Sequence, residues 1–168
     1  MVTRLRGNWA TLLLPIADDD SIDFGRLRAE IDVLIDARVD GIYSNGTAGE
    51  FHNQTEEEYG RVQETLASAC TAASMPFVIG ACHSDPMVSR QRVARAVALK
   101  PRAIQVILPD WWPLTDAEAV DYLALIAEEA RGGAAGALQS AACQARPDAA
   151  RIAVGAVAGA NGRGGQAR

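Results

Sequence analysis

Short apolar runs along the chain alternate with longer segments whose apolar residues recur every three or four positions. The first run covers residues 11–14, and a polar turn at residues 18–21 follows it. After that turn, Phe24, Leu27 and Ile31 have the spacing of one face of a helix. This pattern predicts a strand followed by a helix.

The same order of strand and helix recurs three more times. Two of the later helices begin with a capping box, in which a threonine hydroxyl and a glutamate carboxylate satisfy free backbone amides, and one begins with Asp-Pro. The predicted strands cover residues 41–43, 76–79 and 103–108, and the helix starts lie at residues 55–58, 85–86 and 115–118.

Four apolar strands, each joined to the next through a helix, predict a parallel sheet and therefore the α/β class. Periodicity alone leaves two architectures open, a doubly wound sheet and part of a (β/α) barrel. In both, ligands bind at the carboxyl ends of the strands. The candidate site therefore lies in the loops at residues 45–51, 81–85 and 109–115.

The composition changes abruptly at Arg131. Residues 132–168 contain 13 Ala and 8 Gly, four Arg, one acid and no aromatic residue. Within this segment, residues 152–154 alone resemble a strand. We therefore expect a folded segment at residues 1–131 and a low-complexity tail at residues 132–168, whose sequence fits out-of-frame translation.

The overall composition narrows the class of protein. The chain is 49% hydrophobic and carries a formal charge of -5, which predicts a folded cytoplasmic protein without a membrane span. Its scattered basic residues argue against a nucleic-acid partner. Cys70, Cys82 and Cys143 lack the spacing of a disulfide framework or a zinc site. We expect neither a metal nor a cofactor.

Residues 46–50 carry the clearest local signal for a site. Gly46 and Gly49 flank Thr47, a pattern that allows a tight turn with exposed backbone N–H groups. Such a concavity suits a carboxylate, and the Thr47 hydroxyl can both donate and accept a proton. From these residues alone, a plain structural turn is the first interpretation and a carboxylate site is the alternative.

Seven short motifs follow one another in a characteristic order and spacing. They are Gly7-Asn8-Trp9, Leu14-Pro15-Ile16, Ser21-Ile22-Asp23, Val39-Asp40-Gly41-Ile42, Gly46-Thr47-Ala48-Gly49-Glu50-Phe51, Thr55-Glu56-Glu57-Glu58-Tyr59 and Val78-Ile79-Gly80. As a set, the stretch from about Leu5 to Arg131 resembles the N-terminal half of the dihydrodipicolinate synthase and N-acetylneuraminate lyase family.

The resemblance implies the N-terminal half of a (β/α)8 TIM barrel, about four βα units, in residues 1–131. Members of the family are usually homotetramers that act as class I aldolases or related lyases on pyruvate and other 2-keto acids. A lysine on their strand six forms a Schiff base, and a tyrosine on strand five relays protons. The resemblance therefore implies a lyase with a small 2-keto acid as substrate and a homo-oligomeric assembly.

The family's carboxylate-binding motif carries over to residues 46–49. Thr47 matches the hydroxyl residue that binds the carboxylate and relays protons, so the resemblance makes it the catalytic candidate. Gly46, Ala48 and Gly49 complete the substrate-binding segment, but Ala48 replaces the usual second hydroxyl residue. That replacement removes one hydrogen bond to the carboxylate.

Three aromatic residues are expected near the pocket. Trp111 and Trp112 stand where many members have two tyrosines, the second of which reaches into the site of a neighbouring subunit, and Tyr43 is expected in the barrel interior. An indole N–H donates a hydrogen bond but relays no proton. The two tryptophans are therefore expected to shape a pocket or a subunit contact, or simply to pack over the end of the barrel.

The strand-five tyrosine and the strand-six lysine have no counterpart in this chain. Lys100 is its single lysine, and its place before Pro101 indicates a charge at a helix C-terminus. We expect the front part of a Schiff-base lyase that is inactive alone. The alternative is a non-catalytic half-barrel that binds a small carboxylate or assembles with another subunit. His83 and Cys82 are weaker site candidates. His83 is expected to be a surface or packing residue, and Cys82 is expected to be a thiol that nothing nearby activates.

Overall fold

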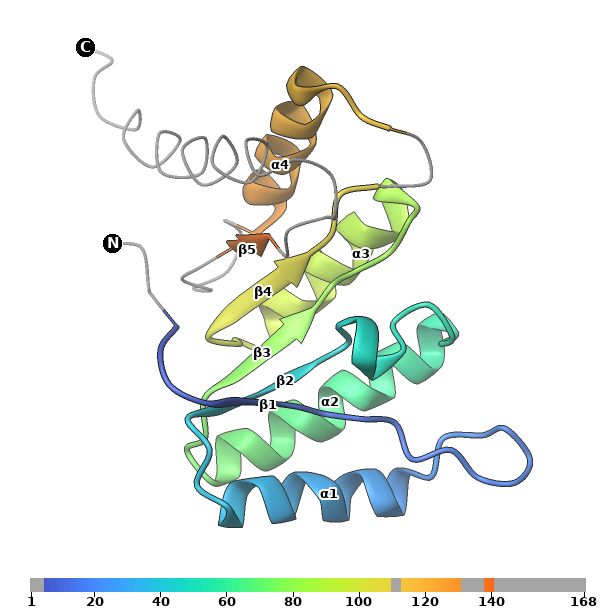
Figure 1. Cartoon of the computed structure of the whole chain (residues 1–168), viewed down its shortest axis with the longest axis vertical. Helices are drawn as coiled ribbons and strands as arrows, with labels where there is room; N and C mark the ends of the chain where they lie inside the picture. The colour runs from blue at the N-terminus through green and yellow to red at the C-terminus, as the bar shows by residue number, and fades with distance from the viewer. Residues whose placement is uncertain (1–4, 110–112, 131–137, 141–168) are drawn as a thin grey trace.

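The computed structural model describes residues 5–109, 113–130 and 138–140, which form one parallel sheet with helices between its strands (Figure 1). The five strands follow chain order across the sheet, and each neighbouring pair is parallel. They are β1 (Trp9–Thr11), β2 (Gly41–Ser44), β3 (Phe77–Gly80), β4 (Ala103–Val106) and β5 (Leu138–Ser140). The prediction of an α/β fold is confirmed.

The second and third helices begin at the residues that the capping signals predicted, whereas the cap of the first helix, Asp23, was not among the predicted signals. Asp23 accepts a hydrogen bond from Arg26 N, Thr55 forms a complete capping box with Glu58, and Asp85 accepts from Met87 N. The helices are α1 (Phe24–Asp36), α2 (Glu56–Ala72), α3 (Pro86–Ala98) and α4 (Asp116–Ala130), with a short 3-10 helix, η1 (Thr47–Gly49), after β2.

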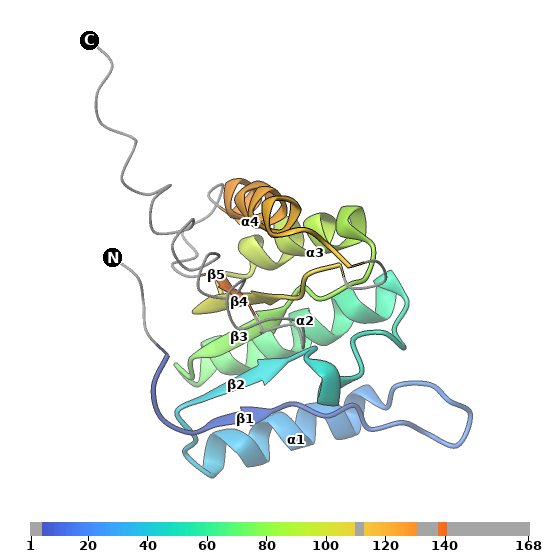
Figure 2. The ribbon, with the colours of Figure 1, turned by 45° about the horizontal axis from the view of Figure 1, so that its top comes forward.

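One face of the sheet packs against the helices and forms the hydrophobic core. Side chains alternate across each strand, so Ile42, Ile79 and Ile104 face the same side and join one buried cluster with Leu27 and Leu66 from the helices. Helix α1 packs on α2, and α3 packs on α4. Seen from a second direction, the helices follow one another along this face of the sheet (Figure 2).

The strand boundaries differ from the prediction by one to three residues. The predicted strand at residues 11–14 is observed at Trp9–Thr11, as β1, after which Leu12 N donates to Tyr43 O and Leu13 N donates to the carboxylate of Glu30. The predicted strand at residues 103–108 ends at Val106.

The short strand β5 lies in the segment that we expected to contribute no strand before residue 152. It pairs in parallel with β4, with Ile104 opposite Leu138. The expectation for this part of the tail was therefore wrong, because ladder pairing depends on backbone groups that even an Ala- and Gly-rich segment carries. Residues 152–154 lie outside the described residues. No helix that the structure describes is long and apolar enough to cross a membrane.

Candidate functional site

The loops after β2 and β3 meet at the carboxyl edge of the sheet. Gly80, the last residue of β3, lies against the backbone of Asn45, the first residue after β2. A Cβ at Gly80 would lie 2.6 Å from the carbonyl oxygen of Ser44, so this close approach requires glycine. Two of the three loops that the sequence predicted as the candidate site, those after β2 and β3, are therefore direct neighbours.

Thr47 opens η1 three residues beyond β2, and its side chain is exposed. Gly49 N donates to Gly46 O at 3.0 Å, and Glu50 N donates to Thr47 O at 3.2 Å. Among the described residues, the backbone N–H groups of Thr47 and Ala48 have no such partner. An exposed hydroxyl beside two free N–H donors is an arrangement that can bind a carboxylate.

Neither glycine of this loop holds a left-handed backbone conformation, and Gly46 is explained by packing. The left-handed backbone positions belong to Asn45, with φ 54°, and Glu50, with φ 50°. Gly46 is required instead by the Tyr43 ring, because a Cβ at Gly46 would lie 2.7 Å from its Cε2 atom. The turn that the sequence predicted exists, and packing of an aromatic ring explains its first glycine.

Tyr43 lies on the face of the sheet opposite the helices, directly beneath the loop that contains Thr47. Burial raises the pKa of the half-buried Tyr43 phenol, and Thr11 on β1 partly opposes that effect through a hydrogen bond. The phenol therefore stays protonated near neutral pH. Its position agrees with the expected place in the interior of a barrel.

A chain of one hydroxyl and three amide side chains, of which Ser44, Asn45 and Gln63 are buried and Gln54 is half-buried, holds the first part of the loop. Ser44 Oγ donates to Gln63 Oε1 at 2.6 Å, and Gln63 Nε2 donates to Asn45 Oδ1 at 2.6 Å. Asn45 Nδ2 donates to Gln54 Oε1 at 2.8 Å, and Gln54 Nε2 donates to the carbonyl of Gly49 at 3.2 Å. We call these four side chains the amide relay.

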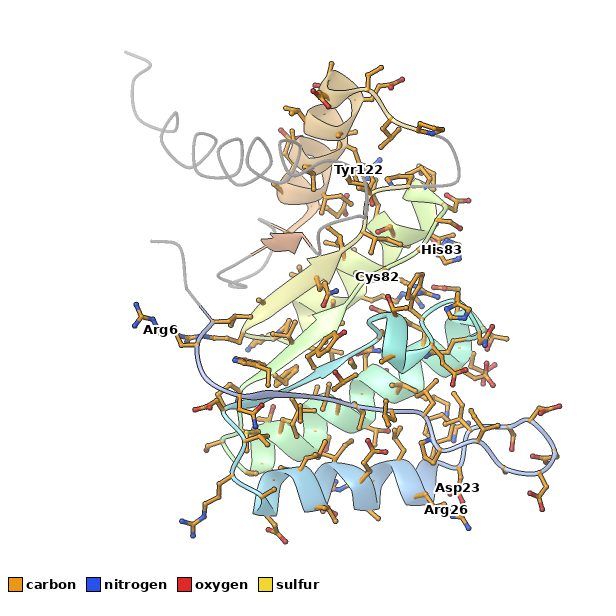
Figure 3. The ribbon with its side chains drawn as sticks, in the orientation of Figure 1. Arg6, Asp23, Arg26, Cys82, His83 and Tyr122 are labelled. Atoms are coloured by element: carbon orange, nitrogen blue, oxygen red, sulfur yellow. The ribbon has the colours of Figure 1, made fainter. Side chains whose placement is uncertain are left out.

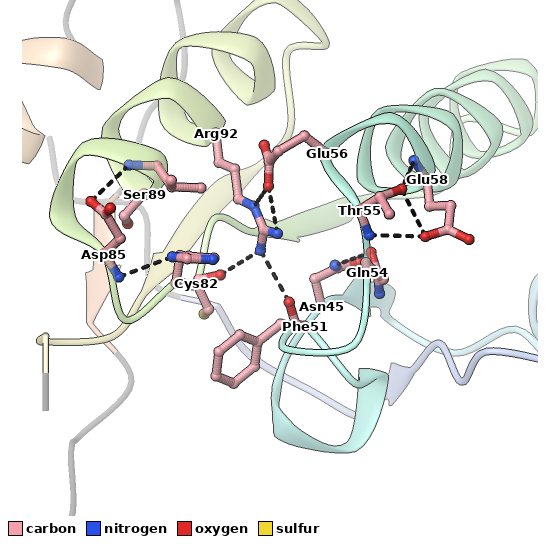
Figure 4. A network of polar contacts seen from close by, with 12 residues as sticks. Asn45, Phe51, Gln54, Thr55, Glu56, Glu58, Cys82, Asp85, Ser89 and Arg92 are labelled. Carbon is pink, nitrogen blue, oxygen red and sulfur yellow. Dashed lines mark hydrogen bonds and ion pairs between the residues drawn. The ribbon is translucent and has the colours of Figure 1, made fainter. Parts of the chain in front are cut away.

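A buried arginine holds the second part of the loop (Figure 4). Arg92 Nη1 donates to the carbonyl of Cys82 at 2.6 Å and to that of Phe51 at 3.2 Å. Its Nε donates to Glu56 Oε1 at 2.9 Å, and Nη2 lies 2.7 Å from the same oxygen as an ion pair. We call Arg92, Glu56 and Arg95, which also pairs with Glu56, the arginine clamp.

Tyr59 supports the arginine clamp from within the core. The Arg92 guanidinium carbon lies 4.3 Å from the centre of the Tyr59 ring, and that of Arg95 lies 5.4 Å from it. Burial would raise the pKa of Glu56, but its hydrogen bonds and ion pairs with Arg92 and Arg95 outweigh that effect and lower it. Glu56 is therefore a charged structural partner.

His83 and Cys82 follow β3 at the edge of the sheet where the sequence expected them (Figure 3). His83 Nδ1 accepts a hydrogen bond from Asp85 N at 2.9 Å, which gives the ring a role in the loop itself. Burial raises the pKa of the Cys82 thiol to about 12, so this cysteine is unreactive at neutral pH. These contacts assign His83 to the structure of its loop and leave Cys82 without a nucleophilic role.

Other candidates lie away from this edge or outside the described residues. Trp111 and Trp112 fall in the segment that the structure does not describe. Lys100 is exposed between α3 and β4, at the amino edge of the sheet and therefore at the end opposite Thr47. Among the described residues, no group of three or more His, Cys, Asp or Glu could hold a metal ion.

The residues that position the loop were missed by sequence reasoning. Arg92 and Gln63 read as ordinary polar positions of helices, yet the structure buries both almost completely. The available signal was their spacing: each lies among the apolar positions that face the core, with Val93 beside Arg92 and Val62 beside Gln63. A polar residue on a buried helix face must find a partner.

Comparison with known proteins found a matching family model and several proteins of similar sequence. The family model described as the Dihydrodipicolinate synthetase family matches residues 4–132. A 4-hydroxy-tetrahydrodipicolinate synthase from Thermomicrobium roseum is 35% identical over 105 residues, which are 62% of this chain and 34% of that protein. An N-acetylneuraminate lyase from Escherichia coli O1:K1 is 29% identical over 132 residues, 79% of this chain and 44% of that protein.

The fold is similar to that of a prophage protein of the dihydrodipicolinic acid synthase family from E. coli K12, solved in complex with pyruvate. The two structures superpose with a TM-score of 0.69 and 24% identity, over 73% of this chain and 41% of that one. The chain thus spans less than half the length of these relatives.

Proposed function

Because this chain belongs to the Dihydrodipicolinate synthetase family, we propose that it forms the carboxylate-binding portion of a lyase that acts on pyruvate or another 2-keto acid. The chemistry is of the class I aldolase type, in which a lysine amine forms a Schiff base with the keto carbon. In this proposal residues 46–49 bind the carboxylate of the substrate, and Thr47 is the catalytic residue. A homo-oligomer is the proposed assembly.

One observation carries the proposal. The exposed Thr47 hydroxyl and the N–H groups of Thr47 and Ala48, which have no backbone partner in the described part of the chain, lie together at the carboxyl edge of a parallel sheet. Ligand sites of barrels and of open α/β sheets lie at this edge. In the proposed complex the substrate carboxylate accepts hydrogen bonds from both N–H groups, and the Thr47 hydroxyl exchanges a proton with the reacting substrate.

Ala48 limits the number of hydrogen-bond donors that the loop offers to a carboxylate. Its methyl group donates no hydrogen bond, so the carboxylate depends on the backbone N–H groups and on Thr47. The Tyr43 ring lies against Gly46, beneath this loop. The proposed loop therefore binds and orients a carboxylate with fewer donors than a loop with two hydroxyl residues.

Lys100 does not supply the Schiff-base amine in this proposal. It lies at the amino edge of the sheet, whereas Thr47 lies beyond the carboxyl edge. A strand of four residues separates these edges by about 10 to 13 Å, farther than covalent attack on a keto acid held by Thr47 allows. The chain of 168 residues thus binds the acid without bonding to it.

A non-catalytic carboxylate-binding half-barrel is the second candidate function. The same location of Lys100 favours it, because the chain carries the binding loop and no correctly placed amine among its described residues. The two candidates share the binding loop. They differ in whether a lysine from elsewhere completes the site.

Two measurements on the chain test the proposed function. Titration with pyruvate, followed by amide NMR of the 15N-labelled chain, is expected to shift the Thr47 and Ala48 signals with saturation. Borohydride treatment with pyruvate, followed by mass spectrometry, is expected to leave the mass unchanged. Thr47→Val is expected to weaken pyruvate binding about tenfold through loss of one hydrogen bond to a charged group.

The matched control is Thr71→Val, because Thr71 is exposed at the last turn of α2, near the amino edge of the sheet. This variant is expected to bind pyruvate as the unmodified chain does. Saturable shifts centred away from Thr47, or none at millimolar pyruvate, would refute the carboxylate site. A stable adduct on Lys100 would refute the assignment of the missing amine.

A further inference from the structure

We infer that the amide relay is a positioning device for the carboxylate-binding loop, with Gln54 and Gln63 as positioning residues. Its effect on substrate rests on the proposed function, whereas its effect on the loop does not. The relay joins the end of β2, the middle of α2 and the carbonyl of Gly49 by side-chain hydrogen bonds. Neither Gln54 nor Gln63 touches the proposed substrate position.

The relay begins in the core, where its members have no access to water. Ser44 is 0% exposed, Asn45 1% and Gln63 1%. Burial of an amide without partners is costly, but here each polar side-chain group between the members finds one at 2.6 Å. This satisfied network fixes Asn45, which holds the left-handed backbone turn that starts the loop.

The relay ends on the loop itself. Asn45 donates to Gln54, and Gln54 donates to the carbonyl of Gly49, the last residue of η1. The peptide that contains this carbonyl also contains the N–H of Glu50, which donates to Thr47 O at 3.2 Å. The Thr47 carbonyl belongs to the same peptide group as the N–H of Ala48, which has no backbone partner among the described residues.

All these hydrogen bonds point in one direction. Each amide accepts through its oxygen and donates through its nitrogen, from the Ser44 hydroxyl through Gln63, Asn45 and Gln54 to the Gly49 carbonyl. Aligned hydrogen bonds in a medium of low dielectric constant polarise one another. The alignment therefore orients the loop and strengthens the Ala48 N–H as a donor.

This arrangement fits the loss of the second hydroxyl residue. With alanine at position 48, a bound carboxylate relies on backbone N–H groups, whose direction is set by the conformation of the loop. The relay is electrically neutral, so it fixes that conformation without placing a negative charge beside an anionic substrate. A carboxylate in place of Gln54 would introduce such a charge.

The first test needs no ligand. In 15N NMR of the full chain near pH 7, Gln54→Met and Gln54→Glu are expected to move the Ala48 and Glu50 amide signals. They are also expected to speed hydrogen exchange at Glu50 about tenfold. The control is Gln91→Met, because Gln91 is exposed on α3 and takes no part in the relay. It is expected to change neither readout.

Gln54→Glu adds a reversal that a purely structural role does not produce. A carboxylate accepts the bond from Asn45 but cannot donate to the Gly49 carbonyl, whereas a protonated carboxyl group can do both. Lowering the pH from about 7 to about 4, below the ordinary pKa of a glutamate side chain, protonates most of this group. The Ala48 and Glu50 signals are then expected to return toward those of the unmodified chain.

The second test uses pyruvate as the probe. Gln54→Met is expected to weaken pyruvate binding about threefold to tenfold, with shifts still centred on Thr47. If the unmodified chain binds no pyruvate, the proposed function fails while the ligand-free test still decides the relay. Unchanged Ala48 and Glu50 signals in both Gln54 variants, or faster exchange spread evenly over the whole chain, would overturn the inference.

Discussion

The amide relay and the arginine clamp hold neighbouring parts of one loop by different physical means. The relay is neutral, and all of its members belong to one strand–loop–helix unit, from Ser44 on β2 to Gln63 on α2. The clamp is charged and joins that unit to the next one, because Arg92 on α3 reaches Phe51, Glu56 and Cys82.

The difference separates local shape from assembly of the sheet edge. A neutral network inside one unit sets the conformation of residues 46–49 with little sensitivity to salt or pH. A buried guanidinium between two units fixes where the loops after β2 and β3 lie relative to each other. Burial of this charge is unfavourable unless all of the hydrogen-bond and ion-pair partners of the guanidinium are present.

The largest expected effect comes from removing the clamp. Arg92→Met leaves the carbonyls of Phe51 and Cys82 without their donor and removes the ion pair to Glu56. We expect the free energy of unfolding to fall by about 3 kcal/mol, measured by urea denaturation. Arg28→Met removes an exposed pair with Asp32 and is expected to cost about 0.5 kcal/mol or less. If both variants lowered the free energy of unfolding equally, the buried arginine clamp would stabilise the chain no more than an exposed ion pair does.

An intermediate effect is expected from cutting the relay in its core. Gln63→Met leaves the Ser44 hydroxyl and the Asn45 side-chain oxygen without partners, which costs about 2 kcal/mol in unfolding free energy. Unlike the loss from Arg92→Met, this loss is expected to be the same at low and high salt, because no charge is involved. The exposed Gln91→Met serves as the control. A loss that varies with salt would contradict the neutral character of the relay.

The smallest expected effect is on the pH dependence of stability. The pKa of Glu56 is lowered in the folded chain from its ordinary value of 4.5, so its contribution is present above that value. That contribution is lost as the pH falls through the lowered pKa. Because the carboxylate is 41% exposed, the loss is about 1 kcal/mol or less.

Glu56→Gln is therefore expected to flatten the decline of unfolding free energy below about pH 4.5, measured by urea denaturation at several pH values. The matched control is Glu57→Gln, an exposed neighbour in the same helical turn whose decline is expected to follow the unmodified chain. A steeper decline in Glu56→Gln would reverse the sign assigned to this carboxylate.

Several parts of the structure were predictable because they depend on residues close together in sequence. The helix starts after Asp23, Thr55 and Asp85 follow from side chains that reach amides two or three residues away. The ordered motifs predicted the family, which the match over residues 4–132 confirms. The place of Thr47 beyond β2 followed from the same local order, and its role in binding stays a proposal.

The sequence by itself determined the alternation of strands and helices, the starts of the capped helices and the loop that contains Thr47, because short-range hydrogen bonds and the periodicity of apolar residues encode them. Only the tertiary structure decided which polar residues hold that loop. Arg92 reaches the Phe51 carbonyl across 41 positions, and Gln63 reaches Asn45 across 18. Such partners meet only after the sheet and helices have packed. A polar side chain needs a hydrogen-bond partner within the protein only once packing has removed it from water.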